Sequence, residues 1–190
     1  VEAYEHCYNN LVKQGFAAKL LKLDNEISKE LVSAITRDRL TYQTAPPGDH
    51  RQNPAERGIQ DVKGHFISVR ACADPTFPKD CWDLLLPHTE LTLNLLRPSR
   101  LNPLVSAYTM VYGHFDYLNH PLAPAGTKVV VHERPKDRGT WDDRGTDGFF
   151  IGHAPQHYRC FNCYMPHTKS TRTSNTVEFF PTCCDIPTID

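Results

Sequence analysis

A length of 190 residues allows one domain, or one domain and a small second one. With 21 Lys and Arg against 22 Asp and Glu, the formal net charge of −1 excludes a globally basic nucleic-acid-binding protein, so any DNA contact must come from local patches. Fifteen prolines, about 8% of the residues against a norm of roughly 5%, predict many interrupted helices and strands.

Cysteine usage and the N-terminus bear on the cellular compartment. Seven cysteines, an odd number without framework spacing, indicate a reduced intracellular protein rather than a disulfide scaffold. The first residues include Glu2, Glu5 and His6 and lack the apolar core of a signal peptide. No apolar run approaches the roughly 20 residues that span a bilayer, so we expect no membrane partner.

The first part of the chain predicts an alternation of helices and strands. A helix is expected over 2–14, a strand over 17–23, a second helix over 27–35 with Asn25 as its N-cap, and a short strand over 40–44. This order favours parallel strands joined by a crossover helix, and therefore an α/β layer.

A longer helix is expected to begin after Asn53, a preferred N-cap residue, with Pro54 at the first helical position. Apolar residues then recur at spacings of three and four and form one stripe: Ile59, Val62, Phe66, Val69 and Ala73. Glu56 stands in the first turn, beside this stripe.

Two weaker helices follow. The apolar spacing from Trp82 to Leu96 predicts a helix kinked at Pro87, and residues 103–112 predict a shorter helix that ends at Gly113.

After residue 121 the pattern changes to short candidate strands separated by Gly, Pro and charged residues. They cover Lys128–His132, Gly148–Gly152, His157–Tyr164 and Thr176–Phe180, and predict a small β barrel or sandwich. We therefore expect three parts: 1–120, 121–182 and a tail over 183–190.

Asp24 and Glu56 carry the most specific chemical signal. A carboxylate that ends a strand and another that opens a later helix can together hold a divalent metal. The alternative is structural, because Asp24 can cap a helix and Glu56 can interact with the helix dipole.

Three segments carry a family resemblance: Leu23-Asp24-Asn25-Glu26, Pro46-Pro47-Gly48-Asp49-His50-Arg51 and Asn53-Pro54-Ala55-Glu56-Arg57. Together they resemble the integrase of copia-type retrotransposons, a member of the Asp-Asp-Glu transferases with a ribonuclease-H-like fold. Thirty-one residues separate Asp24 from Glu56, which is shorter than the usual family spacing.

The resemblance extends to the C-terminal region. Segments 129–133, 139–141 and 145–152 resemble the SH3-like region that follows the catalytic domain of these integrases, and Asn94–Ser99 is close to the family pattern. The implied fold is α/β: a partial ribonuclease-H-like domain with two parallel strands, crossover helices and further helices, followed by a small antiparallel SH3-like β module. The first three strands and the first Asp of the triad are then expected before Val1, which makes the chain a fragment.

The resemblance also implies roles for individual residues. Asp24 and Glu56 become catalytic ligands of Mg²⁺ or Mn²⁺, and Lys63, Arg57 and Arg51 become contacts to nucleic acid. An ordinary solvated lysine remains the alternative for Lys63.

A second metal site is suggested by His157, Cys160, Cys163 and His167, because tetrahedral zinc accepts Cys and His at such spacings. This stretch also reads as a strand, in which Cys160 and Cys163 would point to opposite faces. We therefore favour the strand.

The function implied by the resemblance is DNA integration, meaning metal-dependent processing of DNA 3′ ends and strand transfer into target DNA. The partners are element cDNA ends, target DNA and further copies of the enzyme, in the nucleus or a cytoplasmic particle. The fragment alone is expected to be inactive. The alternative is a non-catalytic module that binds nucleic acid or protein, or a decayed integrase copy.

Overall fold

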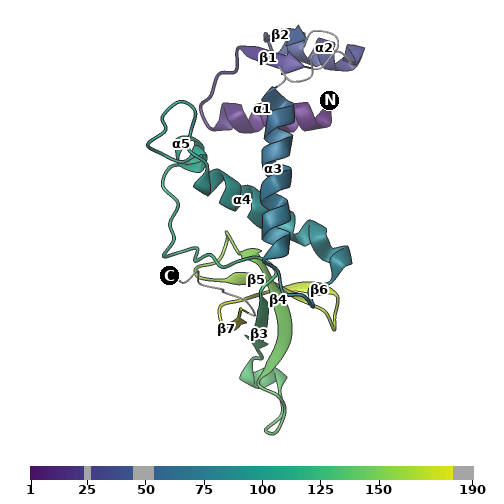
Figure 1. Ribbon diagram of the computed structural model, residues 1–190, viewed down its shortest axis with the longest axis vertical. Helices are drawn as coiled ribbons and strands as arrows, with labels where there is room; N and C mark the ends of the chain where they lie inside the picture. Colours follow the sequence, from purple (N-terminus) through teal and green to yellow (C-terminus); the bar gives the residue numbers. More distant parts are fainter. Residues whose placement is uncertain (24–26, 45–53, 182–190) are drawn as a thin grey trace, which may run out of the picture. The chain divides into compact units, whose positions relative to one another are not determined.

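The computed structural model describes residues 1–23, 27–44 and 54–181 (Figure 1). The chain divides into two compact units, Val1–Asp61 and Val62–Asp190. Within the described residues, no helix is long and apolar enough to cross a membrane.

The first unit contains a small α/β layer, as predicted. Helix α1 (Glu2–Lys13) precedes strand β1 (Leu20–Leu23), and helix α2 (Lys29–Arg37) connects it to strand β2 (Thr41–Thr44). The two strands pair in parallel, with Leu20 opposite Thr41 and Leu23 opposite Thr44. The first strand is shorter than the predicted 17–23.

Polar contacts join helix α1 to the C-terminal end of helix α2. The Tyr4 hydroxyl donates a hydrogen bond to Asp38 over 3.0 Å, and Arg37 forms a 3.0 Å ion pair with Glu5. Burial and the contact with Asp38 raise the pKa of Tyr4 to about 12. Among the described residues of this unit, the buried apolar side chains are those of Ala34, Ile35 and Leu40.

The N-cap of α2 differs from the prediction. Ser28 occupies the cap position, and its hydroxyl accepts a hydrogen bond from the Leu31 amide over 3.2 Å. The proposed cap, Asn25, lies outside the described residues. Serine is as good a cap as asparagine, so local preference alone did not decide between them.

Four helical elements precede the β strands of the second half. Helix α3 (Pro54–Ala71) is followed by the 3₁₀ helix η2 (Lys79–Leu85), helix α4 (Leu86–Leu96) and helix α5 (Ala107–Tyr112). The predicted kink at Pro87 is a junction between η2 and α4. Pro87 lies in the first turn of α4, where its missing N–H breaks no helical hydrogen bond.

Both ends of helix α5 have recognisable caps. At its start, the Ser106 hydroxyl accepts a hydrogen bond from the Thr109 amide over 3.1 Å. At its end, Gly113 adopts a φ of 81° and terminates the helix, as the sequence predicts.

The C-terminal region is a five-stranded antiparallel sheet (Figure 1). Its strands are β3 (Lys128–His132), β4 (Gly145–His153), β5 (Phe161–Met165), β6 (Ser170–Ser174) and β7 (Val177–Phe180), in the order β6-β5-β4-β3-β7. A short 3₁₀ turn, η3 (Pro135–Asp137), lies between β3 and β4. The predicted antiparallel β module is confirmed, and the sheet is separate from that of β1 and β2.

Apolar residues fill both faces of this sheet, because alternate residues of a strand point to opposite sides. On one face, Phe150 packs with a buried cluster of Val129, Val131, Cys163 and Met165. On the other face, Phe149, Ile151 and Tyr164 pack with Phe77, Leu85 and Ala125, and the half-buried Phe66, Val69 and Ala73 cover this second cluster. Residues from α3 and η2 therefore complete the core of the β sheet.

Candidate functional site

Of the two predicted metal ligands, Asp24 and Glu56, only Glu56 lies among the described residues. It lies in the first turn of α3 and is half-buried. A carboxylate in this position interacts favourably with the N-terminal end of the helix dipole. Asp24 and Arg51 lie outside the described residues, so the convergence of Asp24 and Glu56 remains a prediction.

The two other predicted nucleic-acid contacts lie on α3. Arg57 and Lys63 are both exposed. At 100° per residue, Lys63 follows Glu56 by about two turns on the same side of the helix, whereas Arg57 is rotated by about a quarter turn. By helical geometry alone, Lys63 thus shares the side of α3 that carries Glu56, and Arg57 does not.

The predicted apolar stripe of this helix is only half correct. Phe66 and Val69 pack toward the core of the sheet, whereas Ile59 and Val62 are exposed, with 66% and 42% of their surface accessible. The spacing of apolar residues shows which side of a helix is apolar, but it does not show over what length of the helix other elements cover that side.

The zinc alternative is not supported by the structure. Within the described part of the chain, no group of three or more His, Cys, Asp or Glu side chains is placed to hold a metal ion. Cys163 is fully buried on β5, and burial raises the pKa of its thiol to about 12. Zinc binds the thiolate, so this cysteine is a core residue. The predicted strand over 157–164 begins only at Phe161.

A polar groove of about 690 Å³ lies on the β sheet, and sequence reasoning did not identify it. Its lining residues are His132, Arg134, His157, Cys160, Arg172, Thr173, Ser174, Asn175 and Thr176. They come from three separate segments, and one of these, β6, was not predicted as a strand.

Acidic residues balance part of the positive charge in this groove. Arg172 donates a hydrogen bond to Glu133, and this contact lowers the pKa of the Glu133 carboxyl. The Nε2 atom of His132 lies 3.1 Å from the Oε1 atom of Glu178. The exposed Arg134 and the hydroxyl groups of the β6–β7 turn complete a surface that suits anionic oxygen atoms.

Comparison with known proteins supports an assignment for the β sheet. Residues 127–187 match the family model of the retroviral polymerase SH3-like domain. The matched segment includes all five strands of the sheet.

Among solved structures, the chain is similar to one in the cryo-EM structure of the simian T-cell lymphotropic virus intasome in complex with PP2A regulatory subunit B56 gamma. The identity is 16% and the TM-score 0.40, over 96% of this chain and 64% of that chain. The chain thus spans less than two thirds of the length of that chain. No curated protein matches it.

Proposed function

We propose that this chain is part of a retrotransposon integrase, of the copia type, that processes DNA 3′ ends and joins them to target DNA. The observation that carries the proposal is the match of residues 127–187 to a retroviral polymerase SH3-like domain. This region follows, in the same chain, a parallel β1–β2 pair and a helix opened by Glu56. That order is the one implied by the integrase resemblance.

The donor chemistry of the proposed metal site fits Mg²⁺ or Mn²⁺. Glu56 and Asp24 offer hard carboxylate oxygens, which these ions prefer. Bound in such a site, the metal would stabilise the attacking and leaving oxygens of a phosphoryl transfer. The resemblance implies a third carboxylate ligand, upstream of Val1.

The residues of the chain have distinct tasks in this proposal. The first turn of α3 fixes the backbone of Glu56, and the Glu56 carboxylate would bind the metal. Lys63, exposed two turns further along, would neutralise a phosphate of the DNA end, and Arg57 and Arg51 would add charge beside it. We propose that the whole enzyme is a multimer that works in the nucleus or in a cytoplasmic particle.

Strand transfer with a labelled DNA end tests the proposal. We expect no turnover from residues 1–190 alone, and Mg²⁺-dependent turnover from a chain that also carries the upstream coding sequence. In that longer chain, Glu56→Gln should lower the rate at least about 100-fold, because it removes a charged metal ligand. Glu30→Gln is the matched control, since Glu30 is an exposed acid in the first turn of α2.

Two results would contradict this assignment: full activity of the Glu56→Gln chain, or a loss of activity as large in Glu30→Gln. DNA binding without turnover in the longer chain would favour a second candidate, a non-catalytic module. The polar groove on the β sheet specifically supports this second candidate, because Arg134 and the neighbouring hydroxyl groups can contact phosphate oxygens.

A further inference from the structure

Trp141 is exceptionally exposed for a tryptophan, with 97% of its surface accessible. It lies in the connection between β3 and β4, within a turn in which the Gly139 amide donates to the Asp142 carboxylate over 2.7 Å. The Asp142 amide in turn donates to the Gly139 carbonyl over 3.4 Å. Tryptophan is enriched among the residues that dominate binding energy at interfaces. The turn therefore presents a large apolar side chain to solvent, where it is available for a contact.

The charges around Trp141 do not favour a nucleic acid as a binding partner. Segment 138–144 contains two cations and two anions: Arg138, Arg144, Asp142 and Asp143. A nucleic-acid contact would need an excess of positive charge to displace counterions. An apolar pocket with a hydrogen-bond acceptor suits an indole better.

The second unit contains such a pocket, with a volume of about 400 Å³. Its walls come from α3 and the residue that follows it, from α4 and from the segment before β3: His65, Ser68, Val69, Cys72, His88, Thr92, Leu122, Ala123, Pro124 and Ala125. The volume falls in the range of sites that enclose a small ligand or a large side chain. Ser68 donates its hydroxyl proton to the Gly64 carbonyl over 3.2 Å, so its oxygen keeps lone pairs that can accept an indole N–H.

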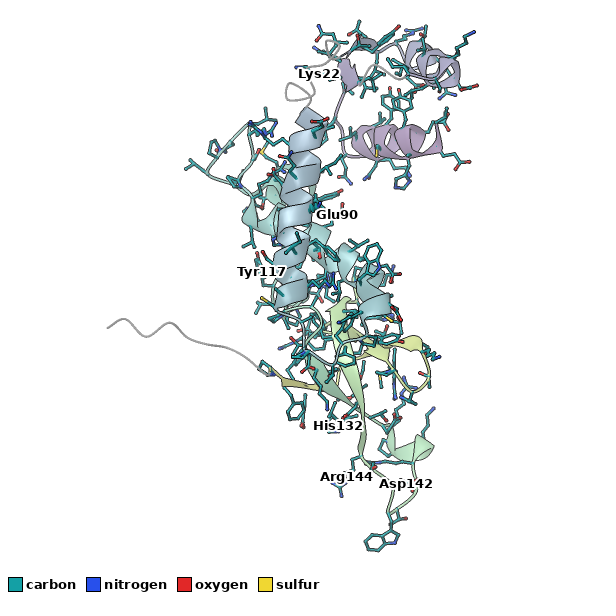
Figure 2. All side chains as sticks on the ribbon, turned by 45° about the vertical axis from the view of Figure 1, so that its right-hand side comes forward. Lys22, Glu90, Tyr117, His132, Asp142 and Arg144 are labelled. Atoms are coloured by element: carbon teal, nitrogen blue, oxygen red, sulfur yellow. The ribbon has the colours of Figure 1, made fainter. Side chains whose placement is uncertain are left out.

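Trp141 cannot fill the pocket of its own chain. The pocket residue His88 lies beside Gly152, because a Cβ atom placed on Gly152 would be 3.8 Å from the His88 Cβ. Trp141 precedes the other end of β4, which begins at Gly145. Gly145 and Gly152 are seven positions apart along β4, which corresponds to about 23 Å at 3.3 Å per residue. Figure 2 shows Asp142 and Arg144 at the tip of the hairpin, far from Glu90 of α4.

We propose that Trp141 of one copy inserts into this pocket of a second copy. Because the side chain and the pocket lie at opposite ends of β4, the contact is head-to-tail and leaves a free Trp141 and a free pocket at the two ends of a dimer. The inference does not depend on the proposed DNA chemistry and concerns different residues.

Mixing two variants of the 190-residue chain tests the contact. Analytical ultracentrifugation without DNA should show concentration-dependent association of the unsubstituted chain. Trp141→Ala removes the inserted group, and Cys72→Trp fills the pocket. Each should weaken self-association at least tenfold, in line with the loss of an interface hot spot. An equimolar mixture should form a dimer, since one variant keeps the pocket and the other keeps Trp141.

The matched control is Cys7→Trp, which places the same side chain at an exposed position of α1 and should associate like the unsubstituted chain. The proposal is wrong if the unsubstituted chain stays monomeric, if Trp141→Ala associates equally well, or if two folded variants fail to pair in the mixture.

A labelling experiment keeps the proposal testable if Cys72→Trp does not fold. Cys72 is exposed and lines the pocket, so association should slow its alkylation by iodoacetamide in the unsubstituted chain at least several-fold. Trp141→Ala should abolish this protection, whereas Cys7 should react at one rate in both proteins. Equal Cys72 rates with and without Trp141 would overturn the contact.

Discussion

At the scale of single residues, His88 illustrates how burial determines charge. Only 4% of its surface is accessible, and its ring packs edge-on against Phe150 with 5.5 Å between the ring centroids. Its Nδ1 atom is buried without a hydrogen-bond partner among the described residues. Burial, and to a lesser extent repulsion from His153 and His65, lowers the pKa of His88 to about 4. The folded protein therefore holds this imidazole neutral.

This low pKa predicts a loss of stability in acid. An unfolded His88 takes up a proton below about pH 6.5, whereas the folded side chain does so only near pH 4. The neutral His88 therefore makes its full contribution to the free energy of unfolding above pH 6.5. This contribution declines as the pH falls toward 4, and the total loss is up to roughly 3 kcal/mol.

Urea unfolding at pH 7.5 and pH 4.5 measures this effect. Trp82 lies in the second unit and its ring packs edge-on against Phe66, so its fluorescence reports on the unfolding of this unit. We expect a smaller pH dependence in His88→Phe, which keeps an aromatic ring against Phe150. His6→Phe, at an exposed position of α1, serves as the control. An unchanged pH dependence in His88→Phe would rule out this histidine as the cause.

At the scale of elements, Gly126 joins the segment after α3 to the β sheet. Its amide donates to the Phe150 carbonyl over 2.7 Å, and its carbonyl accepts from the Asp74 amide over 3.0 Å. Its φ is 82°, and an added Cβ would lie 2.3 Å from the Cβ of Ala73. The tight approach of two segments therefore requires a glycine here.

Replacing this glycine should be more costly than replacing one in open space. Gly113 has a similar φ of 81°, but an added Cβ would meet nothing within 4 Å. Both alanine substitutions carry backbone strain of about 1–3 kcal/mol. Gly126→Ala should cost about 1–3 kcal/mol more, because it also forces Ala73 and the sheet apart. Equal midpoints of urea unfolding for the two variants would show that the close approach of Gly126 to Ala73 does not matter for stability.

Prediction from the sequence succeeded where local patterns decide the structure. The strand Lys128–His132 is confirmed, as are the parallel pairing of β1 with β2 and the end of α5 at Gly113. Strand β6 was missed because Ser170–Ser174 contains no apolar residue, and its pairing with β5 is what makes it a strand.

The sequence likewise predicted the local position of one candidate site residue, but not the cavities. The motif around Pro54 placed Glu56 correctly in a first helical turn. The groove with Arg134 and Arg172 and the pocket with His88 were not predictable, since each is assembled from segments that only the tertiary fold brings together.

At the scale of the whole molecule, the sheet and the preceding helices share one core. Phe149, Ile151 and Tyr164 form one face of the sheet, and they pack with Phe77 and Leu85 from the helical region. The boundary near residue 121 that the sequence suggests would separate these partners. The sheet would keep the cluster around Phe150 and lose the cover of its opposite face.

Two shortened chains test this dependence. Residues 54–190 keep all of α3, whereas residues 121–190 keep the sheet alone. We expect 54–190 to unfold cooperatively in urea and 121–190 to be less stable by several kcal/mol, because each large apolar side chain left uncovered costs about 1.5–3 kcal/mol. The exposed face should also bind a hydrophobic dye such as anilinonaphthalene sulfonate. If 121–190 matches the stability of 54–190 and binds no dye, the SH3-like module is self-sufficient, and the contacts with Phe77 and Leu85 contribute little to its fold.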